Sequence, residues 1–213
     1  MQMAPRPMPP DAKVFASFIR SPQGIYFLFV NIMSPGIAQT PAAGLGDPVA
    51  IILQRYAGTS FEVSYPAGWE TYGSGDDVIF APPGGLSSDA NGENVIHLGI
   101  LVHYETSSDL RKLSLERYTD EFLKQCCRSF PDYRMEHQEV SRDQTAMDTT
   151  VSAIAADGNR SVNRLVTMRL PDAFVAMVLA VPANQAKAYF QLFAKIIGTL
   201  GPAQNSQRPT ARQ

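Results

Sequence analysis

Residues 60–85 read SFEVSYPAGWETYGSGDDVIFAPPGG, and this stretch decides how the fold begins. From Phe61 to Tyr65, apolar and polar side chains alternate, which is the period of a half-buried β-strand. Pro66 then interrupts strand pairing, Gly68 permits a sharp corner, and Trp69 begins a second strand. The stretch therefore predicts two strands joined by a corner, with VIFAPP continuing the meander.

Trp69 is the only tryptophan of the chain. Large aromatic side chains are buried far more often than they serve as exposed platforms, so we expect Trp69 to cover an edge of the core. The alternative is that Trp69 stacks on a ligand at the surface. The two interpretations predict different fluorescence and different effects of removing the side chain.

The segment YGSGDD, residues 72–77, predicts a glycine- and aspartate-containing hairpin turn. A calcium loop would need further oxygen ligands at alternate positions, and Ser74 as a nucleophile would need a positioned base. Further along, residues 94–106, NVIHLGILVHYET, predict one long strand. One face of that strand carries Ile96, Leu98, Ile100, Val102 and Tyr104, and the other carries His97, Gly99, Leu101 and His103.

The second half of the chain predicts a helix, four strands and a final helix. The helix lies within residues 107–131, with Leu115, Tyr118, Phe122, Cys126 and Phe130 at helical spacing. The strands are Tyr133–Val140, Ala146–Ala155, Val162–Leu170 and Phe174–Val181, joined by short connections that favour antiparallel hairpins. The last strand is apolar on both faces, which predicts a central position. The final helix follows Pro182, with an apolar stripe of Ala186, Tyr189, Phe190, Phe193, Ile196, Ile197 and Leu200.

The N-terminal 38 residues are expected to be a signal peptide. Basic residues precede the apolar run GIYFLFVNIM, residues 24–33, and Gly36 and Ala38 have the small-residue spacing that a signal peptidase reads. A ten-residue run is roughly 15 Å long as a helix, whereas a bilayer core needs about twenty residues. We therefore expect cleavage after Ala38 and a periplasmic or secreted protein without an integral membrane span. An uncleaved membrane anchor is the alternative, and a buried N-terminal helix is disfavoured because proline and glycine bracket the run.

The remaining boundaries follow from composition. Residues 39–58 are expected to be a linker and a lead-in segment, and residues 59–200 to be the folded domain. The tail, residues 201–213, has too few apolar side chains to offset the entropy of ordering and is expected to be disordered. With 45% hydrophobic and 18% charged residues, the domain can build a core without disulfides or metal. The net charge of −2 indicates neither nucleic acid nor anionic lipid as a partner.

The two cysteines, Cys126 and Cys127, are neighbours and are expected to be reduced thiols, because a disulfide between adjacent residues needs a strained peptide. The alternative is that the two cysteines form a redox-active or metal-binding pair, but no further metal ligand lies nearby in the sequence. His97 and His103 would be roughly 20 Å apart along one strand, too far to bind one ion. His137 could join one of them through folding, but a scattered histidine of this kind is more often a surface residue or a hydrogen-bonded core residue, and we expect no metal site.

No HExxH, GxSxG, P-loop or GxGxxG motif occurs in the chain. The sequence therefore predicts no catalytic, cofactor-binding or metal-binding residue and no cofactor. The competing hypothesis is an enzyme, or an accessory subunit of an exported hydrolase, in which Asp76, Asp77 and Glu93 gather at one loop edge.

This order of elements predicts an α+β fold, a twisted antiparallel β-sheet flanked by helices. FEVSYPAGW followed by VIFAPP, the central amphipathic helix, and the terminal VLAVPANQAKAYFQLFAKIIGTL resemble the PsbP-like family. They are similar to the domain of that type in exported bacterial proteins, which is sometimes fused to zinc metalloproteases. The resemblance covers about residues 59–200 and implies an α-β-α sandwich. It also implies a non-enzymatic module that binds a protein partner or small ligand in the cell envelope. The alternative is an accessory domain or subunit of an exported hydrolase or metalloprotease.

Overall fold

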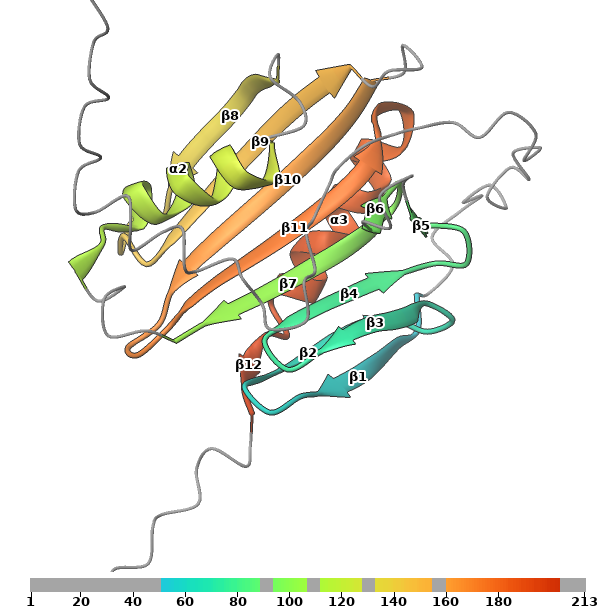
Figure 1. The fold of residues 1–213 in the computed structure, drawn as a ribbon, viewed down its shortest axis with the longest axis horizontal. Helices are drawn as coiled ribbons and strands as arrows, with labels where there is room; N and C mark the ends of the chain where they lie inside the picture. Colours follow the sequence, from blue (N-terminus) through green and yellow to red (C-terminus); the bar gives the residue numbers. More distant parts are fainter. Residues whose placement is uncertain (1–50, 89–93, 107–111, 128–132, 155–159, 204–213) are drawn as a thin grey trace, which may run out of the picture.

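The computed structural model describes residues 51–88, 94–106, 112–127, 133–154 and 160–203 (Figure 1). The expected signal peptide, Glu93 and Phe130 lie outside these residues. In chain order the elements are β1 (Leu53–Ala57), β2 (Phe61–Pro66), β3 (Glu70–Ser74), β4 (Asp77–Ala81), β5 (Leu86–Ser88), β6 (Asn94–Ile96), β7 (Gly99–Glu105), α2 (Leu115–Cys126), β8 (Arg134–Val140), β9 (Ala146–Ile154), β10 (Arg160–Arg169), β11 (Phe174–Pro182), η2 (Ala183–Gln185), α3 (Ala186–Ile197) and β12 (Gly201–Pro202).

A seven-stranded antiparallel sheet with the order β3-β4-β7-β11-β10-β9-β8 forms the middle of the molecule (Figure 1). The predicted hairpins β8–β9, β9–β10 and β10–β11 are confirmed, each with antiparallel register. The prediction that the strand at residues 174–181 is central is also confirmed, because β11 has three strands on either side of it. The α+β class expected from the sequence is therefore correct.

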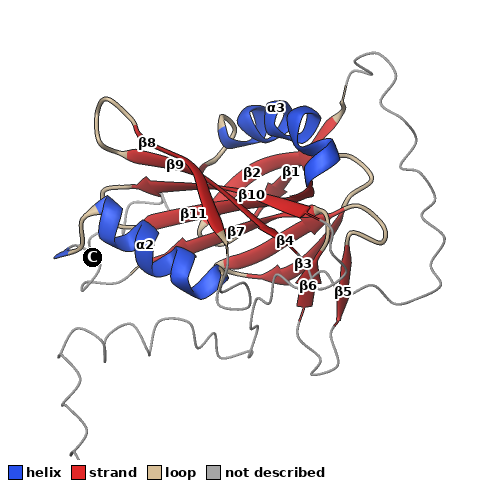
Figure 2. Ribbon diagram, turned by 90° about the horizontal axis from the view of Figure 1, so that it is seen from above, coloured by secondary structure: helices blue, strands red, loops and turns tan. Residues whose placement is uncertain are grey.

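The two faces of this sheet are covered by different elements (Figure 2). Helix α2 packs on one face, where Phe174, Ala176, Val178 and Ala180 of β11 join its core. Helix α3 and strand β2 pack on the opposite face, against Val175, Met177, Leu179 and Val181. Successive side chains of a strand point to opposite faces, so β11 supplies both cores by strict alternation.

The corner in the opening stretch joins two sheets, which the sequence did not reveal. Strand β2 pairs with β1 and β12 in a small three-stranded sheet, and β3 then enters the large sheet beside β4. The predicted single meander is therefore wrong. Gly68 has a φ of 85° at this corner, a conformation that glycine adopts without steric penalty.

The paired region extends beyond residues 59–200 at both ends, which corrects the expected boundaries. Strand β1 lies in the expected lead-in segment and pairs along its whole length with β2. Strand β12 lies in the expected disordered tail and pairs with the other edge of β2, and Ala203 is buried next to it. Both short segments satisfy backbone groups of β2, so pairing orders residues whose own composition does not predict a strand.

The predicted long strand over residues 94–106 is divided in two. The N–H groups of His97 and Leu98 both donate to the carbonyl of Gly85, so the chain bends between β6 and β7. Strand β6 pairs with β5, whereas β7 enters the large sheet between β4 and β11. Ile96 consequently belongs to the core under α2, while Ile100 and Val102 belong to the core under α3.

Candidate functional site: the His103 cluster

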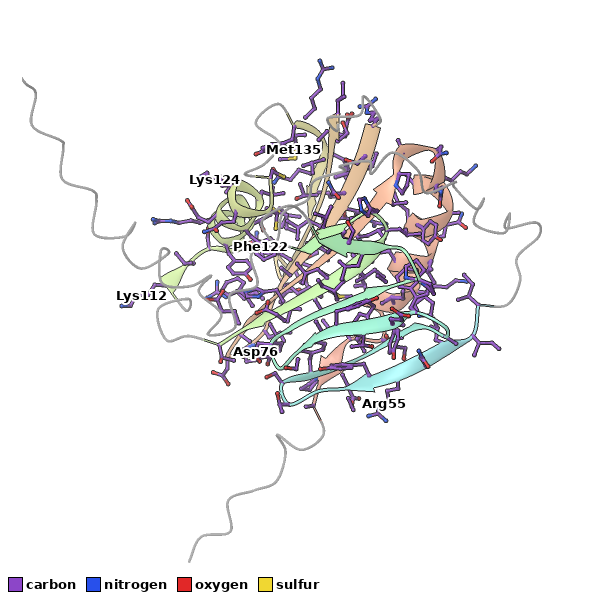
Figure 3. All side chains as sticks on the ribbon, turned by 45° about the vertical axis from the view of Figure 1, so that its right-hand side comes forward. Arg55, Asp76, Lys112, Phe122, Lys124 and Met135 are labelled. Atoms are coloured by element: carbon purple, nitrogen blue, oxygen red, sulfur yellow. The ribbon has the colours of Figure 1, made fainter. Side chains whose placement is uncertain are left out.

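A group of titratable and aromatic side chains lies between β4, β7 and α2. This His103 cluster consists of Asp77, His103, Glu105, Tyr118 and Phe122. His103 and Glu105 are two residues apart on β7 and share one face. The Gly75–Asp76 turn begins β4 at Asp77 and places that residue directly opposite His103. Helix α2 contributes Phe122, which Figure 3 labels on the side of the sheet covered by that helix.

His103 is held between the two carboxylates. Its Nδ1 is 2.6 Å from Oδ1 of Asp77, and its Nε2 is 3.4 Å from Oε2 of Glu105. The three side chains are only 12–17% exposed. The imidazole ring also lies 5.6 Å from the Phe122 ring, between centroids. The cluster is therefore a nearly buried ion network with an aromatic wall.

The charge state of His103 follows from opposing effects. Burial lowers the pKa of His103, but hydrogen bonds and the charges of Asp77 and Glu105 raise it, with a net increase from 6.5 to about 9. At neutral pH the imidazole is consequently protonated, and both ring N–H groups donate to carboxylates. It has no free lone pair with which to accept a proton or bind a metal.

Tyr118 forms the inner wall of the cluster. Its side chain is 2% exposed, and its ring stacks on Phe174 with 4.4 Å between centroids. Burial, reinforced by the charges of Glu105, Cys126 and Asp77, raises the pKa of Tyr118 well above 10. Within the described residues its hydroxyl has no hydrogen-bond partner. Tyr118 is thus a neutral phenol and not a proton donor poised for transfer at physiological pH.

The carboxylates of the competing enzyme hypothesis bind different partners. Asp76 accepts a hydrogen bond from the hydroxyl of Ser60, whereas Asp77 pairs with His103. Glu93 lies outside the described residues. Ser74 is the last residue of β3, at the predicted hairpin turn, where Gly75 has a φ of 74°. The turn has the glycine-first arrangement typical of a two-residue hairpin.

The three histidines lie in separate surroundings. His97 lies between β6 and β7 and its Nε2 is 2.8 Å from the hydroxyl of Ser87, while His103 lies within the cluster. His137 is on β8, exposed, with Nε2 3.6 Å from Oε2 of Glu139. Within the ranges that the structure describes, no three His, Cys, Asp or Glu side chains are arranged to hold a metal ion.

The His103 cluster is not predictable from the sequence, where Asp77 and His103 lie in separate segments. One local signal was present, since His103 and Glu105 are two residues apart on one predicted strand. The third member, Asp77, is 26 residues away in sequence, and only the pairing of β4 with β7 brings it opposite His103.

The two cysteines are free thiols at the end of α2. Cys127 is 6% exposed, and burial raises its pKa to about 11. Burial also raises the pKa of Cys126 well above its usual value of 9. Both thiols border a cavity of about 10 Å³ between α2 and the sheet, which is close to the space of a single water. Neither cysteine has the thiolate character that nucleophilic or redox chemistry requires.

Trp69 packs at the edge of the core under α3, and its ring lies 6.3 Å from that of Tyr189. The side chain is only partly buried. Immediately beside the corner, the N–H of Ala67 donates to the carbonyl of Ile52, whose side chain is 74% exposed. The corner therefore combines a core-edge role with an exposed apolar surface.

The fold and the cluster together define an α+β domain whose buried polar site is an ion network without a free base, nucleophile or metal set among the described residues. The chain is similar in structure to the Ran-binding protein Mog1p of Saccharomyces cerevisiae, with 13% identity, a TM-score of 0.52, and coverage of 74% of this chain and 98% of Mog1p. A second Mog1 structure gives 13% identity, a TM-score of 0.51, and coverage of 73% and 98%. Cyanobacterial PsbP from Synechocystis sp. PCC 6803 gives 16% identity, a TM-score of 0.49, and coverage of 76% and 99%.

At these identities the likeness to Mog1p establishes the fold. No family model matches the chain. No curated protein matches it in sequence either. Of the helices that the structure describes, none has the length and apolar character to cross a bilayer.

Proposed function

We propose that this chain is an exported, non-enzymatic module that binds a protein partner in the cell envelope. The observation that carries the proposal is the state of the His103 cluster. Both ring nitrogens of the His103 imidazolium donate to carboxylates of the same chain, Asp77 and Glu105. This nearly buried group of titratable side chains therefore has no nitrogen left to act on a substrate. Catalysis by general base or metal would need the opposite arrangement.

The surface proposed for the partner is the corner patch, which we define as Ile51, Ile52 and Trp69. Ile51 is 42% exposed and Ile52 is 74% exposed, while Trp69 is anchored on its inner side against α3. Protein interfaces are enriched in aromatic anchors of this kind, surrounded by apolar contacts that exclude water. A small ligand that stacks on Trp69 is the alternative occupant of the same patch.

Export rests on the sequence of residues 1–38. The short apolar run and the small residues Gly36 and Ala38 support a cleaved signal peptide, and hence a periplasmic or secreted protein. A membrane anchor formed by the uncleaved segment is the alternative. Mog1p, which shares the fold, is described as Ran-binding, and this provides a precedent for protein binding by such a scaffold. Ran itself is not proposed as the partner of this chain.

The test is affinity capture of the tagged full-length chain from envelope extract of its own cells. Ile52→Glu places a charge in the corner patch, and Ile154→Glu is a matched control because both isoleucines are 74% exposed. We expect the wild type and Ile154→Glu to retain the same protein and Ile52→Glu to lose it. A captured hydrolase or metalloprotease would support the accessory role implied by the family resemblance.

Two results would contradict the proposal. One is equal capture by all three forms, which would show that the corner patch does not bind the partner. The other is turnover of a substrate by the purified chain, abolished when a residue of the His103 cluster is replaced by its uncharged isostere. Partner loss in Ile52→Glu must be accompanied by unchanged thermal unfolding, so that a folding defect is not counted as lost binding.

A further inference from the structure

Strand β8 ends the large sheet, and its outer edge is the basis of the inference. All seven residues of β8 are exposed, and within the described chain only β9 pairs with it. Figure 3 shows Met135 at this end of the molecule. An edge strand presents a row of unpaired N–H and C=O groups, which is a template for pairing with another chain.

Edge strands are often protected by charges and bulges, and β8 contains both. A bulge separates Met135 from His137, and Glu136 is the extra residue. Glu136, however, accepts hydrogen bonds from Ser152 and Arg160 of its own subunit. That carboxylate is neutralised by the strands behind it, so it does not repel an incoming strand.

The bulge sorts the remaining side chains of β8 between the two faces. Met135, Gln138 and Val140 lie opposite buried residues of β9 that face α2, namely Val151, Thr149 and Met147. His137 and Glu139 lie opposite Thr150 and Asp148 and share the other face. Met135 and Val140, although five residues apart, are therefore on one face, and they are 46% and 36% exposed.

We propose that β8 pairs with β8 of a second copy of this chain in antiparallel register, with Gln138 on the two-fold axis. In this register His137 of each copy lies opposite Glu139 of the other, on the same face. On the opposite face, Val140 lies opposite the bulge of the second copy, where Glu136 is the extra residue and Met135 is the side chain on the same face as Val140. The edge is thus complementary to itself in polar pairing and in apolar surface, and the two large sheets become continuous across the dimer.

Self-complementarity is the reason to prefer a second copy over an unrelated peptide. Within one chain, Nε2 of His137 and Oε2 of Glu139 are 3.6 Å apart and both side chains are exposed, so in this register each His137 lies near its own Glu139 and that of the second copy. A seven-residue strand pair is smaller than the roughly 800 Å² per partner of a standard interface. The dimer is therefore expected to be weak and to dissociate on dilution.

The first experiment measures self-association of the full chain by analytical ultracentrifugation from about 1 µM to about 1 mM. His137→Glu places carboxylates opposite carboxylates and should weaken the dimer at least about tenfold. The double variant His137→Glu with Glu139→His exchanges the charges and should restore wild-type association. Gln191→Glu, an exposed position on α3, is the matched control for adding one negative charge.

The second experiment tests the register. Residues at the two-fold axis of an antiparallel pair have Cα atoms about 4.5–5.5 Å apart, within the range that a disulfide spans. Gln138→Cys should therefore form a covalent dimer under mild oxidation, and Glu139→Cys, which faces His137 of the other copy, should form little. Far-UV circular dichroism checks that each variant folds.

The proposal is overturned if the wild type is monomeric throughout the concentration series. It is equally overturned if His137→Glu leaves a dimer intact, because another surface would then form it. Efficient cross-linking by Glu139→Cys in place of Gln138→Cys would replace the proposed register by a different one. Loss of association in every folded variant, the charge-exchanged form included, would also reject it.

Discussion

The protonated His103 makes the stability of this domain sensitive to pH, and the size of the effect can be worked out from the structure. The pKa of His103 rises from its ordinary value of 6.5 to about 9 in the folded protein. Because the folded state binds the proton more tightly, the resulting stabilisation is fully present below pH 6.5. It is lost as the pH rises through about 9. A difference of this size corresponds to a contribution on the order of 3 kcal/mol.

The assay is urea unfolding followed by Trp69 fluorescence at several values between pH 6 and pH 9. The range ends at pH 9 because the raised pKa values of Cys126 and Cys127 add a pH dependence of the same sign above it. The free energy of unfolding of the wild type should fall by on the order of 3 kcal/mol across this interval. The groups that face His103 are Asp77 and Glu105 from the two strands and Tyr118 from α2. Neutral His103→Gln should remove most of the pH dependence and should itself be destabilising, because it leaves two nearly buried carboxylates without their cation.

His137→Gln is the control, because His137 is 56% exposed and lies outside the cluster. It should keep the wild-type pH profile. The reasoning is refuted if the wild-type stability is flat between pH 6 and pH 9. It is refuted as well if His103→Gln shows the same slope as the wild type.

Three further predictions concern the corner, the cysteines and the N-terminus. Trp69→Ala should destabilise the domain by about 1–3 kcal/mol, less than removal of a fully buried aromatic, because Trp69 is partly exposed. In the wild type, the emission of Trp69 should shift red on unfolding, and a native spectrum identical to the unfolded one would reject the core-edge role. Cys126 and Cys127 should react with a thiol reagent far more slowly in the native protein than in urea at pH 8, because burial raises the pKa of each thiol; equal rates would show that both thiols are accessible in the folded protein. Mass spectrometry of the envelope protein should find a mature chain that starts near Gln39, whereas an intact N-terminus would favour the anchor.

Much of the large sheet was predictable because the pattern of apolar side chains within each strand and helix indicates which of its faces is buried. Strands β8 to β11 are separated by only a few residues each, so pairing of neighbours in sequence is the expected outcome. The apolar residues on both faces of β11 predicted burial on both sides, and the stripe of α3 predicted which side of the helix is buried. In each case, apolar residues that recur every two positions in a strand, or every 3.6 positions in a helix, point to the same side of that element.

The small sheet could not be predicted in the same way. Strand β12 contains only Gly201 and Pro202, too short for any period, and it is ordered because β2 has a free edge to pair with. The bend at His97 similarly depends on a single carbonyl, that of Gly85, which accepts from two successive N–H groups. Such hydrogen bonds join backbone groups of segments that are far apart in the chain, so the residue types of one segment do not indicate them.

The class of the fold, most of the strands and helices, and the burial of β11 on both faces could be predicted from the sequence, because they depend on the order of side chains along one segment. The sheet that β2 joins and the charges that surround His103 depend instead on contacts between segments that are far apart in the sequence. Asp77 and Glu105 meet that histidine because β4 and β7 are adjacent in the sheet and α2 excludes water above them. The pKa of a buried group is set by neighbours in space, and those neighbours are known only once the register of the strands is known.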